Sequence, residues 1–410
     1  MRRDLRIDGA RLWTSLMAMA AVGATPGGGV RRLALSDEDR KARDLLVAWL
    51  QEAGCHVRVD DLGNIYGRRA GTEADAAPVV VGSHLDTVPT GGRFDGALGV
   101  IGGLEVVRAL ADAGAATRRP VEVVCWTNEE GVRFAPAMLA SGVVCGRFTL
   151  EEAYAARDAD GRAFGEELRR IGYLGQAVHR LREAAAYVEL HIEQGPVLER
   201  AGAQIGVVEG IEGISWNRVE VAGRTAHAGP TPLEDRQDAL VAAARIVLGV
   251  RALAERIPGV RATVGHLDVS PNAVNVIPGR VLLTTDLRAR EAEALGRAAA
   301  GLQAVCAEAA RGGVEVRAAE FWRSPPTPFA PGVIGAIARA AEERGCATRR
   351  LWAGAGHDAK HMADRWPAGM IFVPSAGGVS HNEREWTSPE DCARGAEVLL
   401  GTVWRLAGEA

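Results

Sequence analysis

Side chains that commonly bind metal ions follow four apolar runs of this sequence. The runs VVVGSH, VVCWTNEE, YVELH and IFVPSAGGVSH end at His84, at Glu129 and Glu130, at His191, and at His381. Asp95 follows the first run, in the stretch LDTVPTGGRFDG. Three imidazoles and two carboxylates suffice to hold two divalent ions about 3.5–4 Å apart, as in aminopeptidase-like hydrolysis. Such a set suits Zn²⁺, with Mn²⁺, Co²⁺ and Ni²⁺ as alternatives.

The two adjacent glutamates that follow the second run are expected to have different chemical roles. If Glu130 binds a metal ion, Glu129 is left to take the proton from the attacking water. Asp86, two residues after His84, is expected to accept the second imidazole N–H of that histidine through its carboxylate. Each residue alone more often has a structural role, and Asp86 could simply cap the turn before Pro89. The occurrence of all these residues together at strand ends predicts a metal site.

An alternation of apolar runs with amphipathic stretches predicts how these residues come together. Strands are expected at 78–83, 120–126 and 185–193, and helices at 44–54 and 96–114. Continuous apolar strands separated by helices indicate a doubly wound α/β sheet that is covered on both faces. Because the carboxyl ends of strands line the ligand crevice of such sheets, the four strand ends can converge.

The pattern changes after about residue 208. Strands and helices are expected there in the order βαββαβ, a complete ferredoxin-like unit, at 214–223, 234–256, 261–269, 279–289, 291–313 and 314–322. The proline-rich stretch FWRSPPTPFAPG then leads back to the first pattern. We therefore expect a catalytic domain made of residues 1–208 and 323–410, interrupted by a lid or dimerisation domain over residues 209–322.

Composition narrows the class of protein. The chain has 48 Lys and Arg against 52 Asp and Glu and no long basic run, so nucleic acid is not an expected partner. The apolar stretch 12–24 is shorter than a membrane span, so it is expected to form an amphipathic helix, with a signal peptide as the alternative, and no membrane partner is expected. The six cysteines are far apart, which is typical of reduced thiols in a cytoplasmic protein.

Longer stretches of the sequence are similar to one family. They are GSHLDTVPTGGRFDG, WTNEEGVRFAP, ELHIEQGPVLE, GRTAHAGPTPLEDRQDAL, PNAVNVIPG, TTDLR, GAGHDA and SHNE, within residues 82–383. In these stretches the chain resembles the dinuclear metal amidohydrolases of the aminoacylase and metallocarboxypeptidase superfamily. That family includes N-carbamoyl-L-amino acid hydrolases, β-ureidopropionases and allantoate amidohydrolases. The resemblance implies hydrolysis of the ureido C–N bond of N-carbamoyl-L-amino acids, which gives the free amino acid, CO₂ and NH₃.

The resemblance also implies a role for individual residues. One metal ion would be held by His84, Asp95 and His191. The other would be held by Asp95, Glu130 and His381, with Glu129 as the general base. The positions that match the family's substrate-binding residues are Gln194, His227, Asn275 and Arg288, and His357 matches a position near the pocket.

The chemistry of these residues fits such roles. Arg288 can grip a carboxylate with two parallel hydrogen bonds, and His227 can donate to the carbonyl oxygen as charge develops there. Structural alternatives are a pair between Arg288 and Glu291, and a turn held by Asn275. In the resembled family the histidine matching His227 reaches the metal site of the other subunit. Because the edge of a βαββαβ sheet also needs a partner, a homodimer through the inserted domain is expected.

The sequence alone does not exclude several other functions. Allantoate amidohydrolase and β-ureidopropionase would need the same metals and the same Arg288. An N-acyl amino acid hydrolase is more distant, because the stretch HIEQG is typical of the carbamoyl branch. A thiol amidase would use Cys125, although no His or Lys lies beside it in the sequence to lower its pKa. A metal-stabilised binding protein on the same fold would leave Glu129 without a role.

Overall fold

The computed structural model describes residues 5–409, and the chain divides into two compact units. One unit combines the described residues up to Gly210 with those from Pro328 onward, and the other is Ile211–Thr327. The insertion was predicted over residues 209–322, so the observed unit begins two residues later and ends five residues later. The later end arises because strand β12 (Glu315–Ser324) continues past residue 322.

The first unit is built on a mixed sheet, to which nine strands contribute among the described residues. Their order is β1 (His56–Val59), β2 (Ile65–Arg69), β4 (Val121–Trp126), β3 (Val79–His84), β5 (Ala186–Ile192), β15 (Ala368–Val373), β6 (Ile205–Ile211) and β13 (Thr327–Pro328), with β14 (Thr348–Ala353) beside β6. The central strands β4, β3, β5 and β15 are parallel, and β2 and β6 flank them in antiparallel pairs. The predicted parallel strands are thus the centre of the sheet.

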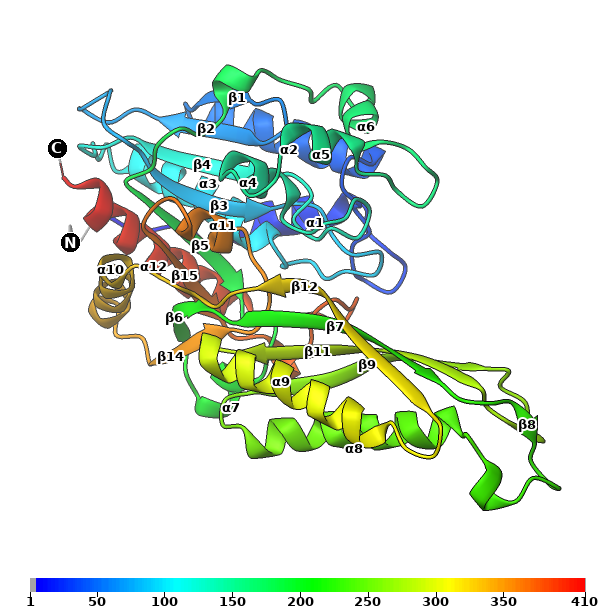
Figure 1. The fold of residues 1–410 in the computed structure, drawn as a ribbon. Helices are drawn as coiled ribbons and strands as arrows, with labels where there is room; N and C mark the ends of the chain where they lie inside the picture. The colour runs from blue at the N-terminus through cyan, green and yellow to red at the C-terminus, as the bar shows by residue number, and fades with distance from the viewer. Residues whose placement is uncertain (1–4, 410) are drawn as a thin grey trace. The chain divides into compact units, whose positions relative to one another are not determined.

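Both faces of these four central strands are covered, since every residue in them is buried. Helices α3 (Ala97–Asp112) and α12 (Pro389–Ala407) pack against β3 and β5, and α11 (Ala359–Ala363) packs against β5 and β15 (Figure 1). The remaining helices of this unit are α1 (Gly9–Ala21), α2 (Asp37–Glu52), α4 (Leu139–Val144), α5 (Leu150–Ala155), α6 (Phe164–Arg170), α7 (Val197–Ala201) and α10 (Pro331–Glu343). This is the doubly wound arrangement that the sequence predicted.

Side-chain caps set where two of the long helices begin. The hydroxyl of Ser36 accepts from the Asp39 N–H at the start of α2, and the first turn of this helix is acidic. Ser388 accepts in the same way from the Asp391 N–H at the start of α12, where Pro389 occupies the first helical position. Helix α2 therefore starts at Asp37, before the apolar periodicity that predicted a helix from residue 44.

The apolar stretch near the N-terminus forms helix α1, as predicted. Asp8 caps it by accepting from the Arg11 N–H, and one face buries Leu12, Leu16 and Met19. This face packs against α3 and α12. Within residues 5–409 no helix is both long enough and apolar enough to cross a membrane.

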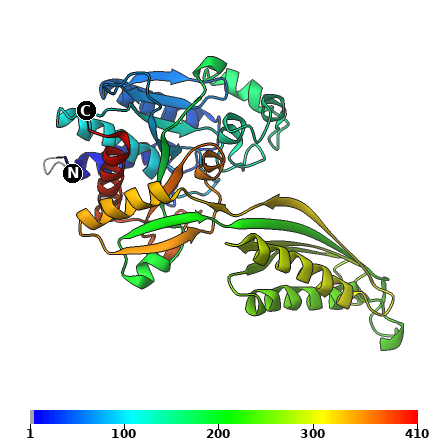
Figure 2. The ribbon, with the colours of Figure 1, turned by 60° about the vertical axis from the view of Figure 1, so that its left-hand side comes forward.

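The second unit has a four-stranded antiparallel sheet in the order β12, β7 (Gly213–Ala222), β11 (Arg280–Ala289), β9 (Arg261–Ser270). Helix α8 (Ala239–Arg256) follows β7, and helix α9 (Ala292–Ala309) follows β11 (Figure 2). The chain order is thus βαββαβ, and the predicted ferredoxin-like topology is confirmed. A separate pair of two-residue strands, β8 (Ala226–His227) and β10 (Val276–Ile277), lies outside this sheet.

Helices α8 and α9 cover one face of this sheet, because alternate residues of its strands are apolar. Val219, Val221 and Leu283 point into the shared core with Ile246 of α8 and Leu302 of α9. Helix α8 begins at Ala239 rather than at the predicted residue 234, since the Asp238 carboxylate accepts from the Leu240 and Val241 N–H groups. Such a cap fixes the first helical residue.

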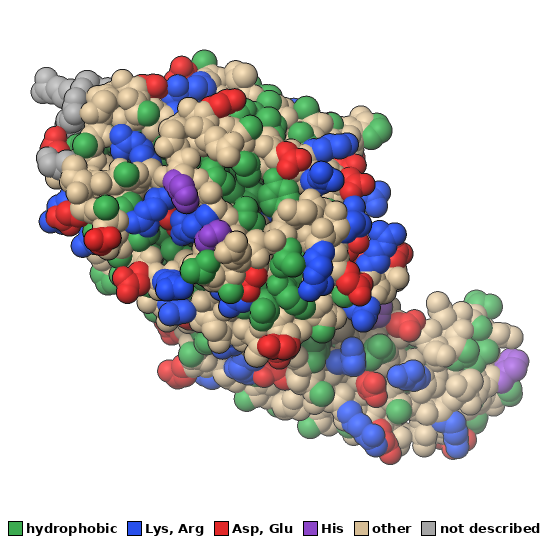
Figure 3. Space-filling model, turned by 90° about the horizontal axis from the view of Figure 1, so that it is seen from above, with side chains coloured by type: hydrophobic (Ala, Val, Ile, Leu, Met, Phe, Trp, Pro, Cys, Tyr) green, Lys and Arg blue, Asp and Glu red, His purple; other side chains and the backbone are tan. Residues whose placement is uncertain are grey.

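Charged side chains are mixed over the surface. The chain carries 48 basic and 52 acidic residues. On the face that Figure 3 shows, the blue and red side chains are interspersed rather than grouped by sign. Within the described residues, this face therefore presents no single-sign field of the kind that tracks a phosphate backbone.

Candidate metal centre and substrate residues

The parallel strands bring the predicted metal ligands to one edge of the first unit's sheet. His84 is the last residue of β3, and His191 is the second-last residue of β5. Glu129 and Glu130 follow the end of β4, and His381 follows the end of β15. Because β4, β3, β5 and β15 are neighbours in the sheet, their carboxyl ends lie together.

Asp95 lies at the centre of this cluster. Its Oδ1 is 3.6 Å from His84 Nε2 and 3.2 Å from His191 Nε2. Its Oδ2 is 3.3 Å from His381 Nε2, which is also 3.5 Å from Glu130 Oε2. The five side chains thus form two groups of potential metal ligands that share one carboxylate.

The spacing of these atoms fits metal coordination. In a tetrahedral zinc site with bonds of about 2.0–2.1 Å, two ligand atoms are separated by roughly 3.3 Å. The separations around Asp95 range from 3.2 to 3.6 Å. Imidazole nitrogen and carboxylate oxygen are also the ligands that zinc and the neighbouring divalent metals bind.

The electrostatics of the cluster fit cations as well. Burial, together with the nearby Asp95, raises the pKa of Glu130 to about 7. Burial raises the pKa of Glu129 well above its ordinary value, and Asp358 and Glu130 add to the shift. Carboxylates this close can be ionised together only beside compensating positive charge, which divalent ions supply. The residues present therefore fit bound metal ions.

Backbone and side-chain contacts hold the ligands in place. His84 Nδ1 lies 2.9 Å from the backbone oxygen of Asp86, so the prediction that the Asp86 carboxylate takes this N–H is wrong. The carboxylate instead accepts from the Glu129 and Glu130 N–H groups, each at 3.2 Å. The physical reason is that the backbone after β3 brings the Asp86 carbonyl within reach of His84 Nδ1, while the loop after β4 engages the Asp86 carboxylate. Asp86 therefore supports both glutamates as well as His84.

Three non-glycine residues beside the cluster have a left-handed backbone. The φ angles are 60° for Asn128, 58° for Gln194 and 52° for His381. Each such conformation costs about 1 kcal/mol or more and persists where surrounding contacts impose it. For Asn128 the contact is a hydrogen bond from Nδ2 to the Phe134 oxygen, 2.7 Å long. This grouping of strained residues is typical of a functional site.

Gln194 contacts the centre directly. Its Nε2 donates to Asp95 Oδ2 at 2.8 Å and to Ser380 Oγ at 3.3 Å, and its backbone N–H donates to Ser375 Oγ. Its Oε1 is buried without a hydrogen-bond partner among the described residues. An amide oxygen left free in this position is suited to accept from a bound substrate. The prediction that Gln194 binds substrate thus gains a physical argument.

Glu385 is a residue of the site that the sequence analysis missed. One carboxylate oxygen accepts from the Phe94 and Asp95 N–H groups, at 3.0 and 3.1 Å, and the other accepts from Ser380 Oγ at 2.8 Å. Burial and the neighbouring Asp95 raise its pKa to about 7. Its spacing four residues after His381 was the available signal. Spacing alone, however, does not indicate which backbone a carboxylate binds.

His357 lies inside the first unit, next to the cluster. Its ring centroid is 4.4 Å from that of His191 and 5.8 Å from that of Phe372. Burial, followed by the charge of His191, lowers the pKa of His357 well below its ordinary value. Its ring is therefore neutral at physiological pH, and Nε2 has no hydrogen-bond partner among the described residues. A contact of His357 with substrate stays a prediction.

A third group of potential ligands combines Glu189 with His191 and His357. The Glu189 carboxylate already accepts hydrogen bonds from Ser83 Oγ, Tyr187 OH and the Ala359 N–H. His191 Nδ1 lies 2.9 Å from the Ile192 oxygen. Because these groups are occupied within the core, we treat this set as support for His191 rather than as a separate metal site.

The second unit carries three of the predicted substrate residues, and the strand pair β8–β10 brings two of them together. His227 pairs with Val276, and the Ala228 N–H donates to the Asn275 oxygen at 2.9 Å. The side chains of His227 and Asn275 are exposed. Asn275 thus helps to hold the turn, as its structural alternative proposed, while its side chain stays accessible.

Arg288 lies on strand β11, with a partner that the sequence analysis did not name. Its Nη2 is 2.7 Å from Asp286 Oδ2, and Nε donates to the same carboxylate. Arg288 thus pairs with Asp286, whereas the structural alternative drawn from the sequence was a pair with Glu291. The reason is the two-residue period of a strand, which puts residues 286 and 288 on the same face. The guanidinium is a quarter exposed and thus accessible.

Cys125 is unsuited to act as a nucleophile. It lies in β4 and is fully enclosed, with Sγ directed at the backbone oxygen of Trp126. Burial raises the pKa of its thiol to about 12. Since the thiolate is the reactive form, the structure gives no support to the thiol amidase alternative.

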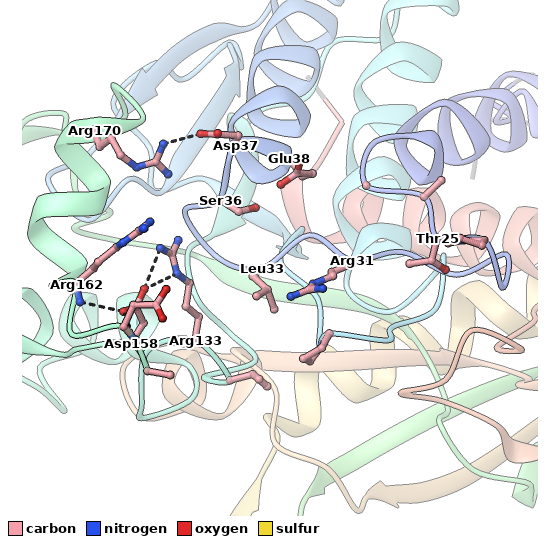
Figure 4. Close-up of a pocket in the computed structure, with 17 residues that line it drawn as sticks. Thr25, Arg31, Leu33, Ser36, Asp37, Glu38, Arg133, Asp158, Arg162 and Arg170 are labelled. Carbon is pink, nitrogen blue, oxygen red and sulfur yellow. Dashed lines mark hydrogen bonds and ion pairs between the residues drawn. The ribbon is translucent and has the colours of Figure 1, made fainter.

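A cavity of about 950 Å³ lies elsewhere on the first unit. Its walls carry ion pairs between Arg133 and Asp158 and between Arg170 and Asp37, which Figure 4 shows as dashed lines. None of the predicted ligands lines it. Its walls carry both basic and acidic side chains, and part of its lining is the N-terminal segment Gly23, Ala24, Thr25 and Pro26.

Comparison with known proteins agrees with the fold. Residues 80–405 match the peptidase family M20/M25/M40. The chain is 46% identical over 404 residues to the N-carbamoyl-L-amino-acid amidohydrolase of Rhizobium meliloti, covering 98% of this chain and 97% of that one. It is 34% identical to the allantoate amidohydrolase of Bacillus subtilis, with 95% of each chain covered. A hydantoinase/carbamoylase family amidase from Burkholderia multivorans superposes with a TM-score of 0.95 at 50% identity, covering 98% of both chains.

Fold and relatives together define a hydrolase that acts on amide C–N bonds. The chain belongs to the peptidase family M20/M25/M40, whose match covers most of its length. The resemblance seen in its sequence motifs is confirmed.

Proposed function

We propose that the protein hydrolyses the ureido C–N bond of N-carbamoyl-L-amino acids in a dinuclear metal centre. One water is consumed, and the products are the free amino acid, CO₂ and NH₃. Three relatives named for this reaction are 46%, 44% and 40% identical to the chain and a fourth is 32% identical, whereas the allantoate amidohydrolase is 34% identical. This difference favours the carbamoyl substrate over allantoate.

The position of Glu129 is the observation that carries the proposal. Its Oε2 lies 3.6 Å from His84 Nε2, yet it belongs to neither group of potential ligands around Asp95. A carboxylate beside a metal centre without a ligand duty is suited to act as general base. Its backbone N–H is held by Asp86, which supports a fixed orientation.

The two ligand groups would hold Zn²⁺, or alternatively Mn²⁺, Co²⁺ or Ni²⁺: His84, Asp95 and His191 in one, and Asp95, Glu130 and His381 in the other. When bound, such ions lower the pKa of water and polarise the carbonyl of the substrate. Glu129 takes the proton of the attacking water and passes it to the leaving nitrogen. His227 donates a hydrogen bond to the carbonyl oxygen as negative charge develops there.

The remaining side chains bind the substrate. Arg288 holds the carboxylate of the amino acid with two parallel hydrogen bonds. Gln194 offers its free amide oxygen to the ureido N–H groups, while Asn275 and His357 supply further contacts. The free Oε1 of Gln194 and the partly exposed guanidinium of Arg288 support these assignments.

A substrate panel tests the proposed reaction against its neighbours. Ammonia release is measured with N-carbamoyl-L-amino acids, their D-enantiomers, N-carbamoyl-β-alanine and allantoate, and amino acid release with N-acetyl amino acids. We expect the highest kcat/KM with an N-carbamoyl-L-amino acid. A higher value with allantoate, N-carbamoyl-β-alanine or an N-acetyl amino acid would assign the protein to the corresponding branch of the family instead.

Arg288→Lys should raise KM for N-carbamoyl-L-amino acids about tenfold or more, since an ammonium group cannot reproduce the two parallel hydrogen bonds of the guanidinium. Steady-state kinetics measure the effect. Arg290→Lys is the matched control, because Arg290 pairs with Glu212 and we give it no contact with substrate. Equal KM values for Arg288→Lys and wild type would remove Arg288 from the site.

We further propose a homodimer through the second unit. Strand β9 is an edge strand, which among residues 5–409 pairs with β11 alone. Exposed apolar side chains lie on this edge and on α8, which packs beside it: Leu267, Val241 and Leu248, the last 71% exposed. An open, apolar strand edge is a common site of two-fold association. In the dimer, His227 would complete the metal centre of the partner subunit.

Complementation tests the composite site. Glu129→Gln and His227→Ala chains, each inactive alone, are co-expressed and assayed. In a mixed dimer, the site with intact Glu129 receives His227 from the other chain, while the second site lacks both residues. Random pairing makes half of the dimers mixed, and each mixed dimer has one working site of two. Activity should therefore recover to about a quarter of wild type.

The control for complementation pairs Glu129→Gln with Glu130→Gln. Both changes lie in the part of the site that one chain supplies alone, so no complete site can form and no recovery is expected. If mixed dimers of Glu129→Gln and His227→Ala chains form without regaining activity, His227 does not act across the dimer.

We also propose a cytoplasmic location. All six cysteines are free in the structure, and burial raises the pKa of several of their thiols. Unreactive, unpaired thiols are typical of a reducing compartment. Cell fractionation with antibody detection tests this location.

A further inference from the structure

His381 is the predicted ligand that the sheet holds least firmly. Its side chain is 52% exposed, whereas Asp95 and Glu130 beside it are 6% and 8% exposed. It lies eight residues after the end of β15 and has a φ angle of 52°. Strand β15 therefore cannot fix its position, and other contacts must hold the loop 380–386.

An N-terminal turn, residues 23–31, packs against that loop. Thr25 Oγ1 donates to Glu383 Oε1, two residues after His381. At Gly29, an added Cβ would lie 2.7 Å from the Cα of Glu383, so a larger residue would displace the loop backbone. The Val30 N–H donates to the Gly91 oxygen at 2.9 Å, and the Gly91 N–H donates to the Val30 oxygen at 3.0 Å. The turn thus ties the loop of His381 to the segment that leads to Asp95.

Aromatic packing from helix α1 joins the same two segments. Trp13 stacks on Phe94, with ring centroids 5.7 Å apart, and meets Trp386 edge-on at 5.6 Å. Phe94 and Trp386 also contact each other edge-on at 5.7 Å. Phe94 precedes Asp95, and Trp386 closes the loop of His381. The N-terminal segment therefore contacts the neighbours of two ligands of the same metal ion.

From these contacts we infer that residues 13–29 form a positioning element for the metal ion held by Asp95, Glu130 and His381, with Thr25 and Gly29 as its key residues. The inference rests on the proposed dinuclear centre. This segment precedes residue 80, where the match to the family begins. The other ion shares Asp95 but has its two further ligands, His84 and His191, at or within strands β3 and β5, so it depends less on this segment because the buried sheet fixes those two residues.

Zinc titration by calorimetry tests the inference on protein stripped with a chelator. Wild type should bind two Zn²⁺ ions. In Thr25→Val and in Gly29→Ala, one binding step should keep its Kd, and the other should weaken about tenfold to a hundredfold, as is usual when support of a ligand is lost. Glu130→Gln identifies the step, since it should weaken the same one.

Two further variants separate positioning from a general loss of structure. Thr25→Ser retains the hydroxyl and should restore the weakened step. Gly332→Ala serves as the glycine control, because an added Cβ there meets nothing within 4 Å. The inference would be overturned if both binding steps kept their wild-type Kd in Thr25→Val and Gly29→Ala. It would also be overturned if both steps weakened equally and the Tm fell. Fewer than two ions in wild type would instead overturn the dinuclear centre.

Discussion

Glu129→Gln should lower kcat by about a hundredfold or more while the protein keeps its full metal content, because the change removes a general base but no ligand. The amide is nearly the same size as the carboxylate and accepts no proton at neutral pH. Glu129 is buried, and its backbone N–H is held by Asp86 whatever its side chain, so the fold around it should not change. Steady-state kinetics and elemental analysis measure the two quantities.

Glu130→Gln is the contrasting variant for this experiment. Glu130 Oε2 lies 3.5 Å from His381 Nε2, within a ligand group, so its amide should cost one bound ion together with activity. If metal content falls in Glu129→Gln and is retained in Glu130→Gln, the roles of the two glutamates are exchanged. If Glu129→Gln retains wild-type kcat, another group acts as the base.

Removal of the metal ions should abolish turnover and leave the protein folded. The ligands lie at one edge of the large sheet, whereas its four central strands are buried along their whole length. Apolar burial on that scale stabilises the unit without contributions from the cluster. Chelated protein should therefore show background ammonia release, an unchanged far-UV circular dichroism spectrum and a cooperative thermal transition at a lower Tm.

Reloading the chelated protein provides the control. Zn²⁺, Mn²⁺, Co²⁺ and Ni²⁺ are added back one at a time, and activity and Tm should both recover with at least one of them. Turnover that survives complete chelation would contradict metal-dependent hydrolysis. Loss of the cooperative transition on chelation would show that the ions are needed for folding.

Periodicity allowed much of the fold to be predicted. Continuous apolar runs and amphipathic stretches are local properties, so β3, β5 and α3 were expected close to where they lie. The order βαββαβ of the second unit followed in the same way. The predicted helix boundaries were less accurate where a capping side chain sets the first residue of the helix. Helix α8, capped by Asp238, begins later than predicted, and helix α2, capped by Ser36, begins earlier. A cap depends on one side chain, which periodicity does not detect.

Contacts between distant segments were not predictable from local pattern. Glu385 accepts from the Asp95 N–H across 290 residues of sequence. Thr25 reaches Glu383 across 358 residues. The sequence carried no signal for the contact of Glu383, and the spacing of Glu385 from His381 did not identify its partner.

The sequence by itself determined which residues can bind metal and that they gather at one sheet edge, because the carboxyl ends of parallel strands meet whatever the rest of the chain does. Tertiary structure alone decided how the ligands are held. The backbone after β3 gives His84 the carbonyl oxygen of Asp86 rather than its carboxylate. The N-terminal turn supports the exposed His381, which no strand fixes. Such support comes from the packing of remote segments, and packing depends on the shape of the whole unit rather than on the spacing of residues along the chain.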